Sequence, residues 1–449
     1  MKEEIPDIIN EPPAKNSLEL RKKDEEYGFA TLFLSGKQLP IAIKRGKGAV
    51  LEDVDENKFI DFTSGIAVSN VGHCNPYVID AAKKQMDDLI HISQHIAHYE
   101  THTMLKEKLA EITPGDLKRS FLCNSGGEAI ESLIKVSKFY SERDAFLGFT
   151  GAFHGQSVAA MSLSASSSGW KFGFQPLLPC VYHAPFPYCY RCPFGEEYPG
   201  CSFQCIEFLH KFLDTVIHPY EIATIITEPI QGEKGAIVPP PEFLPELRKI
   251  CDENDIIFAL DEVQTGFGRT GKMFACEHFG VAPDLMALAK GIAGGFPLGA
   301  LVGKEEIMNQ EMGHGSTFGG NPVSCAAALA AIDFILKEKL PERAEKLGKF
   351  AFKILKEVKE DTEIVGDLRG KGLLIGLEIV SDKDKKTPSG RLAEKIREVA
   401  MKNGVLMVGQ FGKNNIRVIP PLVISEELLE KGLNILCDAI KKVDSEARK

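Results

Sequence analysis

Two charged residues follow short apolar runs in a way that suggests chemistry. Asp261 comes directly after the run 256–260, and Lys290 comes directly after the run 285–289. An apolar run that leads into a polar segment is typical of a buried parallel strand, and ligands of open α/β sheets collect beyond the carboxyl ends of such strands. A carboxylate and an amine at neighbouring strand ends form either a buried ion pair or part of a catalytic site.

Two loops of small residues favour the catalytic site, because both are suited to binding phosphate. Ser125, Gly126 and Gly127 precede a helical stretch, where free backbone N–H groups and the helix dipole attract an anion. The alternative for Ser125 alone is a plain N-cap. The second loop, 314–322, contains Thr317. Together these residues indicate a ligand with a phosphate, a ring that needs a carboxylate partner and a carbonyl that reacts with an amine, which is pyridoxal 5'-phosphate.

Motifs across nearly the whole chain resemble the class III (ω-type) aminotransferases, a family of fold-type I pyridoxal phosphate enzymes. They extend from residues 61–65, through the signature 259–271 with Lys290 beyond it, to residues 417–422. The resemblance implies an α/β fold in which a mainly parallel sheet flanked by helices forms a large domain and the two chain ends form a smaller α+β domain. It also implies a free amino acid as substrate and a homodimer or a dimer of dimers.

The resemblance also assigns roles to individual residues. Lys290 is expected to be the Schiff-base lysine and, once the substrate amine displaces it, the general base at the substrate Cα. Asp261 is expected to keep the pyridine nitrogen protonated. The other expected cofactor contacts are Phe153 stacked on the ring, Gln264 at the phenolic oxygen, Ser125, Gly126 and Gly127 around the phosphate, and Thr317 reaching the phosphate from the partner subunit.

Four positions bear on the substrate. Gln156 stands where members that use 4-aminobutyrate or ornithine have an arginine that clamps a carboxylate, and an amide does not replace that charged fork. Ile66 stands where ornithine-specific members have a tyrosine. Glu233 and Arg417 resemble a gated pair, in which Glu233 masks Arg417 until a substrate α-carboxylate replaces it. One clamp kept and one lost predicts an α-amino acid with an uncharged side chain.

These departures narrowly favour an amino-acid racemase or epimerase, an activity of some archaeal and bacterial members of the family. Racemisation needs no keto acid, whereas the common acceptor 2-oxoglutarate carries two carboxylates and fits such a pocket poorly. Glu233 is then expected to act opposite Lys290 on the second face of Cα, and a role as the gate alone is the equal alternative. The alternative reaction is amino transfer to a 2-oxo acid. A remote alternative is a non-catalytic binding module, which would not need Lys290.

These residues require a scaffold of alternating strands and helices, which the apolar runs predict. Residues 1–74 form an N-terminal segment that joins the small domain, 75–334 the large cofactor-binding domain, and 335–449 the C-terminal small domain. Buried parallel strands are expected at 146–149, 223–226, 256–260 and 285–288, and further strands in the small domain at 370–380 and 414–423.

Composition and charge exclude several kinds of partner. The 449 residues include 53 lysines and arginines against 63 aspartates and glutamates, a formal net charge of -10, so nucleic acid and anionic lipid would be repelled. No apolar run approaches the ~20 residues that cross a bilayer, and residues 1–10 lack the basic start of a secretory signal. We therefore expect a cytoplasmic enzyme without nucleic-acid or membrane partners.

Four of the 11 cysteines lie close together in an insert rich in proline, glycine and aromatic residues. They are Cys189, Cys192, Cys201 and Cys205. Their spacing allows zinc ligation or two disulfides, and free buried thiols are the other possibility. The histidines between residues 73 and 98 lack a clear third metal ligand, so no metal is included in the predicted site.

Overall fold

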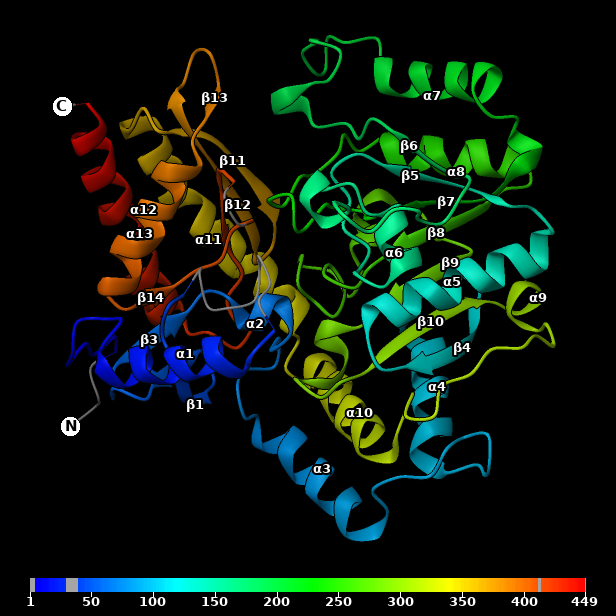
Figure 1. Cartoon of the computed structure of the whole chain (residues 1–449), viewed down its shortest axis with the longest axis horizontal. Coiled ribbons are helices and arrows are strands. Elements are labelled where there is room, and N and C mark those ends of the chain that lie inside the picture. The colour runs from blue at the N-terminus through cyan, green and yellow to red at the C-terminus, as the bar shows by residue number, and fades with distance from the viewer. Residues whose placement is uncertain (1–4, 30–38, 411–412, 449) are drawn as a thin grey trace. The chain divides into compact units, whose positions relative to one another are not determined.

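The computed structural model of the chain describes residues 5–29, 39–410 and 413–448. The chain divides into two compact units, shown in Figure 1. One unit contains both chain ends, Met1–Asn75 and Glu342–Lys449, and the other is the continuous stretch Pro76–Pro341. The boundaries predicted from the sequence follow residues 74 and 334.

The continuous unit is built on a seven-stranded sheet with the order β4-β10-β9-β8-β7-β5-β6. Every strand pairing is parallel except the two that β10 makes with β4 and β9, so β10 runs against the other six strands. The strands are β4 (Leu117–Cys123), β5 (Ala145–Phe149), β6 (Val181–Ala184), β7 (Ile222–Thr227), β8 (Ile257–Asp261), β9 (Leu285–Leu288) and β10 (Gly299–Lys304).

The central strands are buried over their whole length, because apolar helices cover the sheet. Every residue of β5, β7, β8 and β9 is buried. On one face, Ile130 and Leu133 of α5 and Leu163 of α6 form a core with Phe146, Ala259 and Ala287 of the strands. Figure 1 shows α5 and α6 over the face turned to the viewer. The helices of this unit are α3 (Pro76–Asp88), α4 (Glu100–Ile112), α5 (Gly126–Ser141), α6 (Val158–Leu163), α7 (Gln204–Thr215), α8 (Phe243–Glu253), α9 (Glu305–Met308) and α10 (Pro322–Lys337).

The unit formed by the chain ends contains two small sheets. One has the order β1-β2-β3-β14, and in the other β12 pairs with β11, β13 and β15. The strands are β1 (Ile43–Lys47), β2 (Val50–Asp53), β3 (Lys58–Asp61), β11 (Val365–Lys371), β12 (Leu374–Asp382), β13 (Thr387–Pro388), β14 (Val405–Leu406) and β15 (Asn415–Val418). The helices are α1 (Lys15–Tyr27), α2 (Ser64–Ala67), α11 (Leu340–Asp361), α12 (Gly390–Lys402) and α13 (Glu426–Ala447).

Two strand predictions in this unit need correction. The stretch 370–380 is not one strand, because it contains the end of β11, a turn and most of β12. Gly372 supplies the turn with a φ of +54°, a conformation that favours glycine. The strand predicted at 414–423 ends at Val418, shortly before Pro420 and Pro421, which lack the N–H groups that a strand ladder needs. Among the described residues, no helix has the length and apolar character required to cross a bilayer.

Candidate active site

The carboxyl ends of five strands of the seven-stranded sheet meet at one edge. Asn124 and Ser125 follow β4, Thr150 follows β5, and Glu228 follows β7. Asp261 is the last residue of β8, and Lys290 lies two residues after the end of β9. The register is close, since Thr227 pairs with Leu260 and Asp261 pairs with Ala287. Residues far apart in the chain are thereby gathered where α/β sheets bind their ligands.

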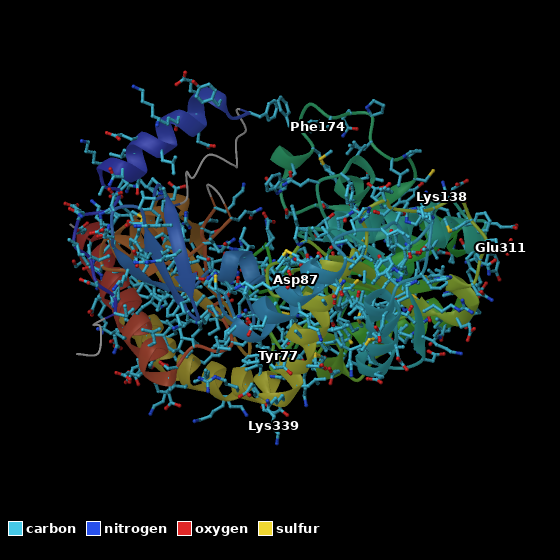
Figure 2. All side chains as sticks on the ribbon, turned by 90° about the horizontal axis from the view of Figure 1, so that it is seen from below. Tyr77, Asp87, Lys138, Phe174, Glu311 and Lys339 are labelled. Carbon is cyan, nitrogen blue, oxygen red and sulfur yellow. The ribbon has the colours of Figure 1, made fainter. Side chains whose placement is uncertain are left out.

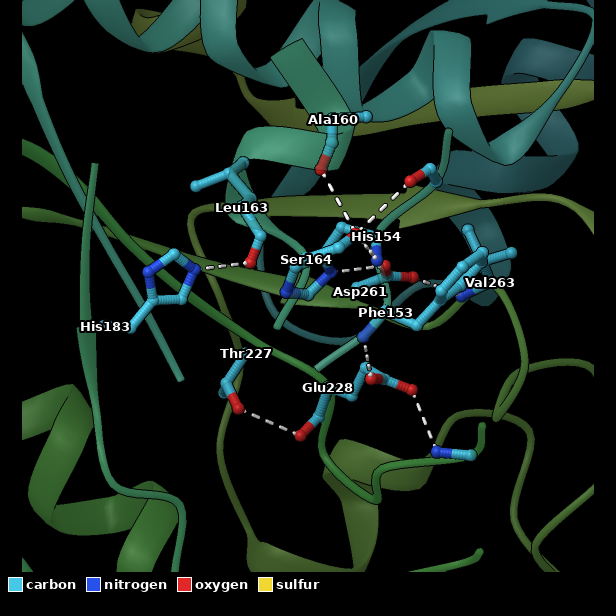
Figure 3. A network of polar contacts seen from close by, with 12 residues as sticks. Phe153, His154, Ala160, Leu163, Ser164, His183, Thr227, Glu228, Asp261 and Val263 are labelled. Carbon is cyan, nitrogen blue, oxygen red and sulfur yellow. Dashed lines mark hydrogen bonds and ion pairs between the residues drawn. The ribbon is translucent and has the colours of Figure 1, made fainter. Parts of the chain in front are cut away.

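Asp261 is held in place by a buried histidine that the predicted site did not include. His154 Nδ1 lies 2.7 Å from Asp261 Oδ2, and both side chains are almost completely buried (Figure 3). The backbone N–H of Val263 donates to Asp261 Oδ1 at 3.0 Å. His154 N donates to Ser164 Oγ at 2.8 Å, which anchors the histidine in turn. The carboxylate is therefore fixed in orientation and keeps lone pairs for one more donor, such as a ring N–H.

A second buried carboxyl, that of Glu228, lies in the same network. Its Oε1 accepts the N–H of Phe153 and its Oε2 accepts the N–H of Gly232, each at 2.9 Å (Figure 3). Burial, and then the negative charge of Asp261, raise the pKa of Glu228, whereas His154 and the two backbone N–H groups lower it. The sequence placed both His154 and Glu228 at strand ends, which was the available signal, but spacing alone did not show their contacts.

The predicted phosphate loop forms the start of α5. Ser125 has an extended backbone and its hydroxyl accepts the N–H of Glu128 at 3.2 Å, so it is an N-cap. A Cβ added at Gly127 would make only ordinary van der Waals contact, at 3.7 Å from Ser157 Oγ. An added Cβ at Gly155 would lie 2.9 Å from the Gly127 Cα, so the segment after β5 closely approaches the helix start. The N-terminus of a 16-residue helix, lined by glycines, suits a phosphate.

Lys290 lies beside this helix start in a conformation that its residue type rarely adopts. Its φ is +46°, and such backbone strain in a residue other than glycine is concentrated at functional sites. The preceding residue, Ala289, is close to the α5 loop, because a Cβ added at Gly126 would contact Ala289 Cβ at 3.6 Å and Val263 Cγ1 at 2.9 Å. Lys290 itself is half-buried.

Two further predicted contacts lie on neighbouring loops. Phe153 is half-buried, and Trp170 packs against it with ring centroids 5.6 Å apart and an interplanar angle of 60°. Gln264 is buried and its side chain lies against Gly232, because a Cβ added at Gly232 would come within 2.3 Å of Gln264 Oε1. Glu233, next to Gly232, is half-buried.

Thr317 lies on an exposed loop that is attached to the start of the phosphate loop. Ser316 Oγ accepts an N–H from the Asn124 side chain at 3.1 Å, and it also accepts the N–H of Gly319 at 3.0 Å. The loop is also tied to α5, since His314 Nε2 lies 2.8 Å from Ser132 Oγ. The Thr317 side chain itself is exposed.

The three residues predicted to contact the substrate through their side chains are placed differently. Gln156 is exposed, two residues beyond His154. Ile66 and Arg417 belong to the other unit. Ile66 is 46% exposed with a φ of +68°, a strained value for a β-branched residue, whereas Arg417 is buried in β15. The gate between Glu233 and Arg417 stays a prediction.

The residues at the sheet edge fit pyridoxal phosphate. The carboxylate of Asp261 suits the pyridine nitrogen, the start of α5 suits the phosphate and the Lys290 amine suits the aldehyde. A buried nitrogen also remains, because His154 Nε2 has no hydrogen-bond partner among the described residues. His154 Nε2, on the side of the ring away from Asp261, can therefore still make one hydrogen bond.

The four clustered cysteines line one small cavity of about 20 Å³. All 11 cysteines of the chain lie in the described residues and all are free thiols, so no disulfide closes this insert. Across the described ranges, no group of three or more histidine, cysteine, aspartate or glutamate side chains is arranged to hold a metal ion. Cys189 and Cys205 both have a pKa raised to about 11, first by burial.

Comparison with known proteins agrees with this geometry. The profile of the Aminotransferase class-III family matches residues 34–440. A 4-aminobutyrate aminotransferase of Mycobacterium leprae (strain TN) is 42% identical over 439 residues, 96% of either chain. The leucine/methionine racemase of Thermococcus litoralis is 38% identical and covers 95% of this chain and 97% of its own. A solved amine transaminase from an uncultivated Pseudomonas species, in the PLP-bound form, has a TM-score of 0.87 at 29% identity and covers 94% of this chain and 98% of its own.

Proposed function

Since the chain belongs to the class III aminotransferase family, we propose that it transfers the amino group of an α-amino acid with an uncharged side chain to a 2-oxo acid. Its fold is that of the fold-type I enzymes and its cofactor is pyridoxal 5'-phosphate, as the sequence predicted. The observation that carries the proposal is the meeting of Asp261, Lys290 and the Ser125 loop at one sheet edge.

The expected division of labour follows from these positions. Bound pyridoxal phosphate supplies a ring that accepts the electron pair left at the substrate Cα. Asp261, oriented by His154, holds the proton on the ring nitrogen. The start of α5 binds the phosphate. Lys290 Nζ would take up the Cα proton, and return of that proton to the cofactor instead of to Cα would distinguish amino transfer from simple exchange at Cα.

Amino transfer is better supported than the racemisation that the sequence narrowly favoured. The solved relative compared above is an amine transaminase, and the 4-aminobutyrate aminotransferase of M. leprae is 42% identical against 38% for the T. litoralis racemase. Racemisation remains the second candidate because that racemase matches nearly the full chain and because Gln156 offers no charged clamp for a second carboxylate. Glu233 is then the second proton carrier rather than only the gate for Arg417.

A single assay separates the two reactions. The holoenzyme is incubated with L-leucine or L-alanine, with and without a 2-oxo acid acceptor, and the products are resolved by chiral chromatography. We expect the acceptor to be converted to its amino acid in step with loss of the donor. Formation of the D-enantiomer without any acceptor would instead establish the racemase, and reaction of neither kind would reject both.

We also propose a homodimer, which the expected role of Thr317 requires. Large apolar side chains are exposed around its loop, among them Ile90 at 64%, Ile96 at 78% and Phe318 at 61%. The segments that carry Ile90 and Phe318 lie next to each other, because the rings of His91 and Phe318 stack with centroids 4.7 Å apart. The charge balance and the free thiols support the proposed cytoplasmic location.

A further inference from the structure

Glu228 is a buried carboxyl that has no part in the chemistry described so far. It lies directly after β7 and its side chain is 4% exposed. Buried carboxylates are costly unless they are paired or hydrogen-bonded, and each Glu228 oxygen accepts one backbone N–H. These two N–H groups belong to Phe153 and Gly232, which lie 79 residues apart in the sequence.

The two N–H groups belong to two different parts of the site. Phe153 is expected to stack on the cofactor ring. Gly232 begins the tight turn that carries Glu233, which is expected to mask Arg417 until a substrate α-carboxylate replaces it. This turn is closed by the pairing of Gln231 with Ile237 and by a hydrogen bond from Gly235 N to Gly232 O at 3.1 Å.

Two side chains of the Glu233 turn also contact the backbone before and after Phe153. Gln231 Nε2 donates to Thr150 O at 2.9 Å, and Lys234 Nζ donates to Ser166 O at 3.1 Å. Glu228 is the contact that reaches the Phe153 backbone itself, at the point where the chain enters the site. Its removal therefore leaves the turn attached to Thr150 and Ser166 but takes away the contact at Phe153 itself.

We propose that Glu228 is a positioning residue that holds the ring-stacking Phe153 and the Glu233 turn in a fixed relation to each other. Cofactor binding and substrate binding are then linked through one side chain. The inference rests on the proposed function, since Phe153 and Glu233 have their roles from it.

The charged groups around Glu228 support this role. Asp261 disfavours its ionised form and His154 favours it, and both belong to the network that orients the ring nitrogen partner. Burial is the largest effect and raises the pKa of Glu228. An ionised carboxylate accepts both N–H bonds fully, whereas a protonated carboxyl carries a donor on one oxygen. The ability of Glu228 to bind both segments thus depends on the same charges that set the state of the site.

The test compares the Glu228→Gln holoenzyme with the wild type. The glutamine is isosteric, but its NH₂ group must face one of the two backbone N–H groups, so one contact becomes repulsive. We expect amide hydrogen exchange to accelerate in the peptides covering both 151–155 and 230–236. We also expect a roughly tenfold higher dissociation constant for pyridoxal phosphate and a roughly tenfold higher KM for the amino acid. The fluorescence of Trp170, the only tryptophan of the chain, reports changes at Phe153 directly.

Asp53→Asn is the matched control. Asp53 is fully buried in the other unit, and its Oδ1 accepts the N–H groups of Asp55 and Asn57 at 2.9 and 2.8 Å. This variant measures the general effect of neutralising a buried acceptor, and it should leave the cofactor dissociation constant and the KM unchanged.

A second variant keeps the proposal testable if the glutamine variant does not fold. Glu228→Asp retains the charge but is too short to reach both N–H groups, so faster exchange in one segment with an intermediate rise in KM is expected. The proposal is overturned if neither variant changes exchange in either segment, or if KM and cofactor affinity move no more than in Asp53→Asn. Exchange and cofactor affinity do not depend on the reaction type, so this failure is distinct from failure of the proposed amino transfer.

Discussion

At the scale of single residues, a substitution of Gln156 tests the proposed substrate preference most directly. Its side chain is exposed, so an arginine is accommodated there without repacking the core. We predict that Gln156→Arg raises kcat/KM for 4-aminobutyrate and 2-oxoglutarate by about tenfold or more relative to neutral α-amino acids, because a guanidinium binds a carboxylate through two parallel hydrogen bonds. Steady-state kinetics with paired substrates measure the change.

Gln156→Lys is the control for this variant. It adds the same charge without the fork, so we expect a smaller gain. Equal gains from lysine and arginine would show that charge alone matters. No gain from either would mean that residue 156 does not face the substrate, and the inferred preference for uncharged side chains would lose its basis.

His102 on α4 links stability to pH. Its ring is 4% exposed, and its Nε2 has no hydrogen-bond partner among the described residues. Burial, with smaller effects from Lys106 and His98, lowers the pKa of His102 to about 4 from its ordinary 6.5. Between these values the unfolded chain binds a proton that the folded chain does not, so the free energy of unfolding falls as pH falls from about 6.5 to 4.

We predict that His102→Phe weakens this pH dependence, because phenylalanine fills the site without a titrating nitrogen. Urea unfolding at pH 7.5 and pH 5 measures the difference, which we expect to be on the order of 1 kcal/mol. His210→Phe, at an exposed position of α7, is the control and should leave the pH dependence as in the wild type. A wild-type pH dependence in His102→Phe would show that other groups account for it.

The sequence predicts which single residues lie at strand ends, but it does not predict their contacts. Asp261 and Lys290 were predictable because each follows a short apolar run, and the run itself shows that they lie at strand ends. His154 and Glu228 follow strands too, but their partners come from other strands, at separations of 107 and 75 residues. Only strand order and register bring those atoms within 3 Å, and neither can be read from spacing.

At the scale of elements, the start of α5 is expected to combine a stability role with a binding role. Ser125 caps the helix, so Ser125→Ala should lower the free energy of unfolding by about 1 kcal/mol. If this helix start also binds the cofactor phosphate, the same change should raise the dissociation constant of pyridoxal phosphate several-fold. Thermal unfolding of the cofactor-free protein and a fluorescence titration with the cofactor measure the two effects.

Ser425→Ala is the control that separates the loss of helix capping from the loss of phosphate binding. Ser425 caps α13 in the same way, with its hydroxyl accepting the N–H of Leu428 at 3.1 Å. We expect this control to lose similar stability and to bind pyridoxal phosphate normally. If both variants bind it equally well, Ser125 is only an N-cap, which is the alternative that its sequence context allowed.

The elements themselves were predictable to different degrees. The four expected buried runs contain or overlap β5, β7, β8 and β9, because strands covered on both faces are apolar throughout. The reversed strand β10 was not predicted, since direction leaves no mark on composition. The hairpin of β11 and β12 was missed although Gly370, Lys371 and Gly372 mark its turn, because the expected strand was started inside the end of β11.

At the scale of the whole molecule, the chain places its two most separated segments, Met1–Asn75 and Glu342–Lys449, in one unit. The predicted cofactor residues lie in the other unit, whereas Ile66 and Arg417 lie in this one. The predicted substrate residues are thus divided between the units, because Gln156 and Glu233 belong to the unit of the cofactor residues. The sequence shows the residue types of both, but the relation between Glu233 and Arg417 depends on how the units dock, which no local pattern specifies.

The proposed homodimer can be tested by placing a charge in its expected interface. Ile96 is the most exposed large apolar side chain of the surface that also includes Ile90 and Phe318. A glutamate at this position would bury an unpaired charge in a dimer interface, at a cost of several kcal/mol. We therefore expect Ile96→Glu to shift the protein to monomers in sedimentation velocity, and to weaken pyridoxal phosphate binding if Thr317 completes the phosphate site of the partner.

Val216→Glu is the control. It changes another apolar side chain, which is 53% exposed and lies directly after α7, and it should affect neither the oligomeric state nor cofactor binding. A dimeric Ile96→Glu protein would place the interface elsewhere. A monomer that binds the cofactor with wild-type affinity would instead show that each chain holds the phosphate alone.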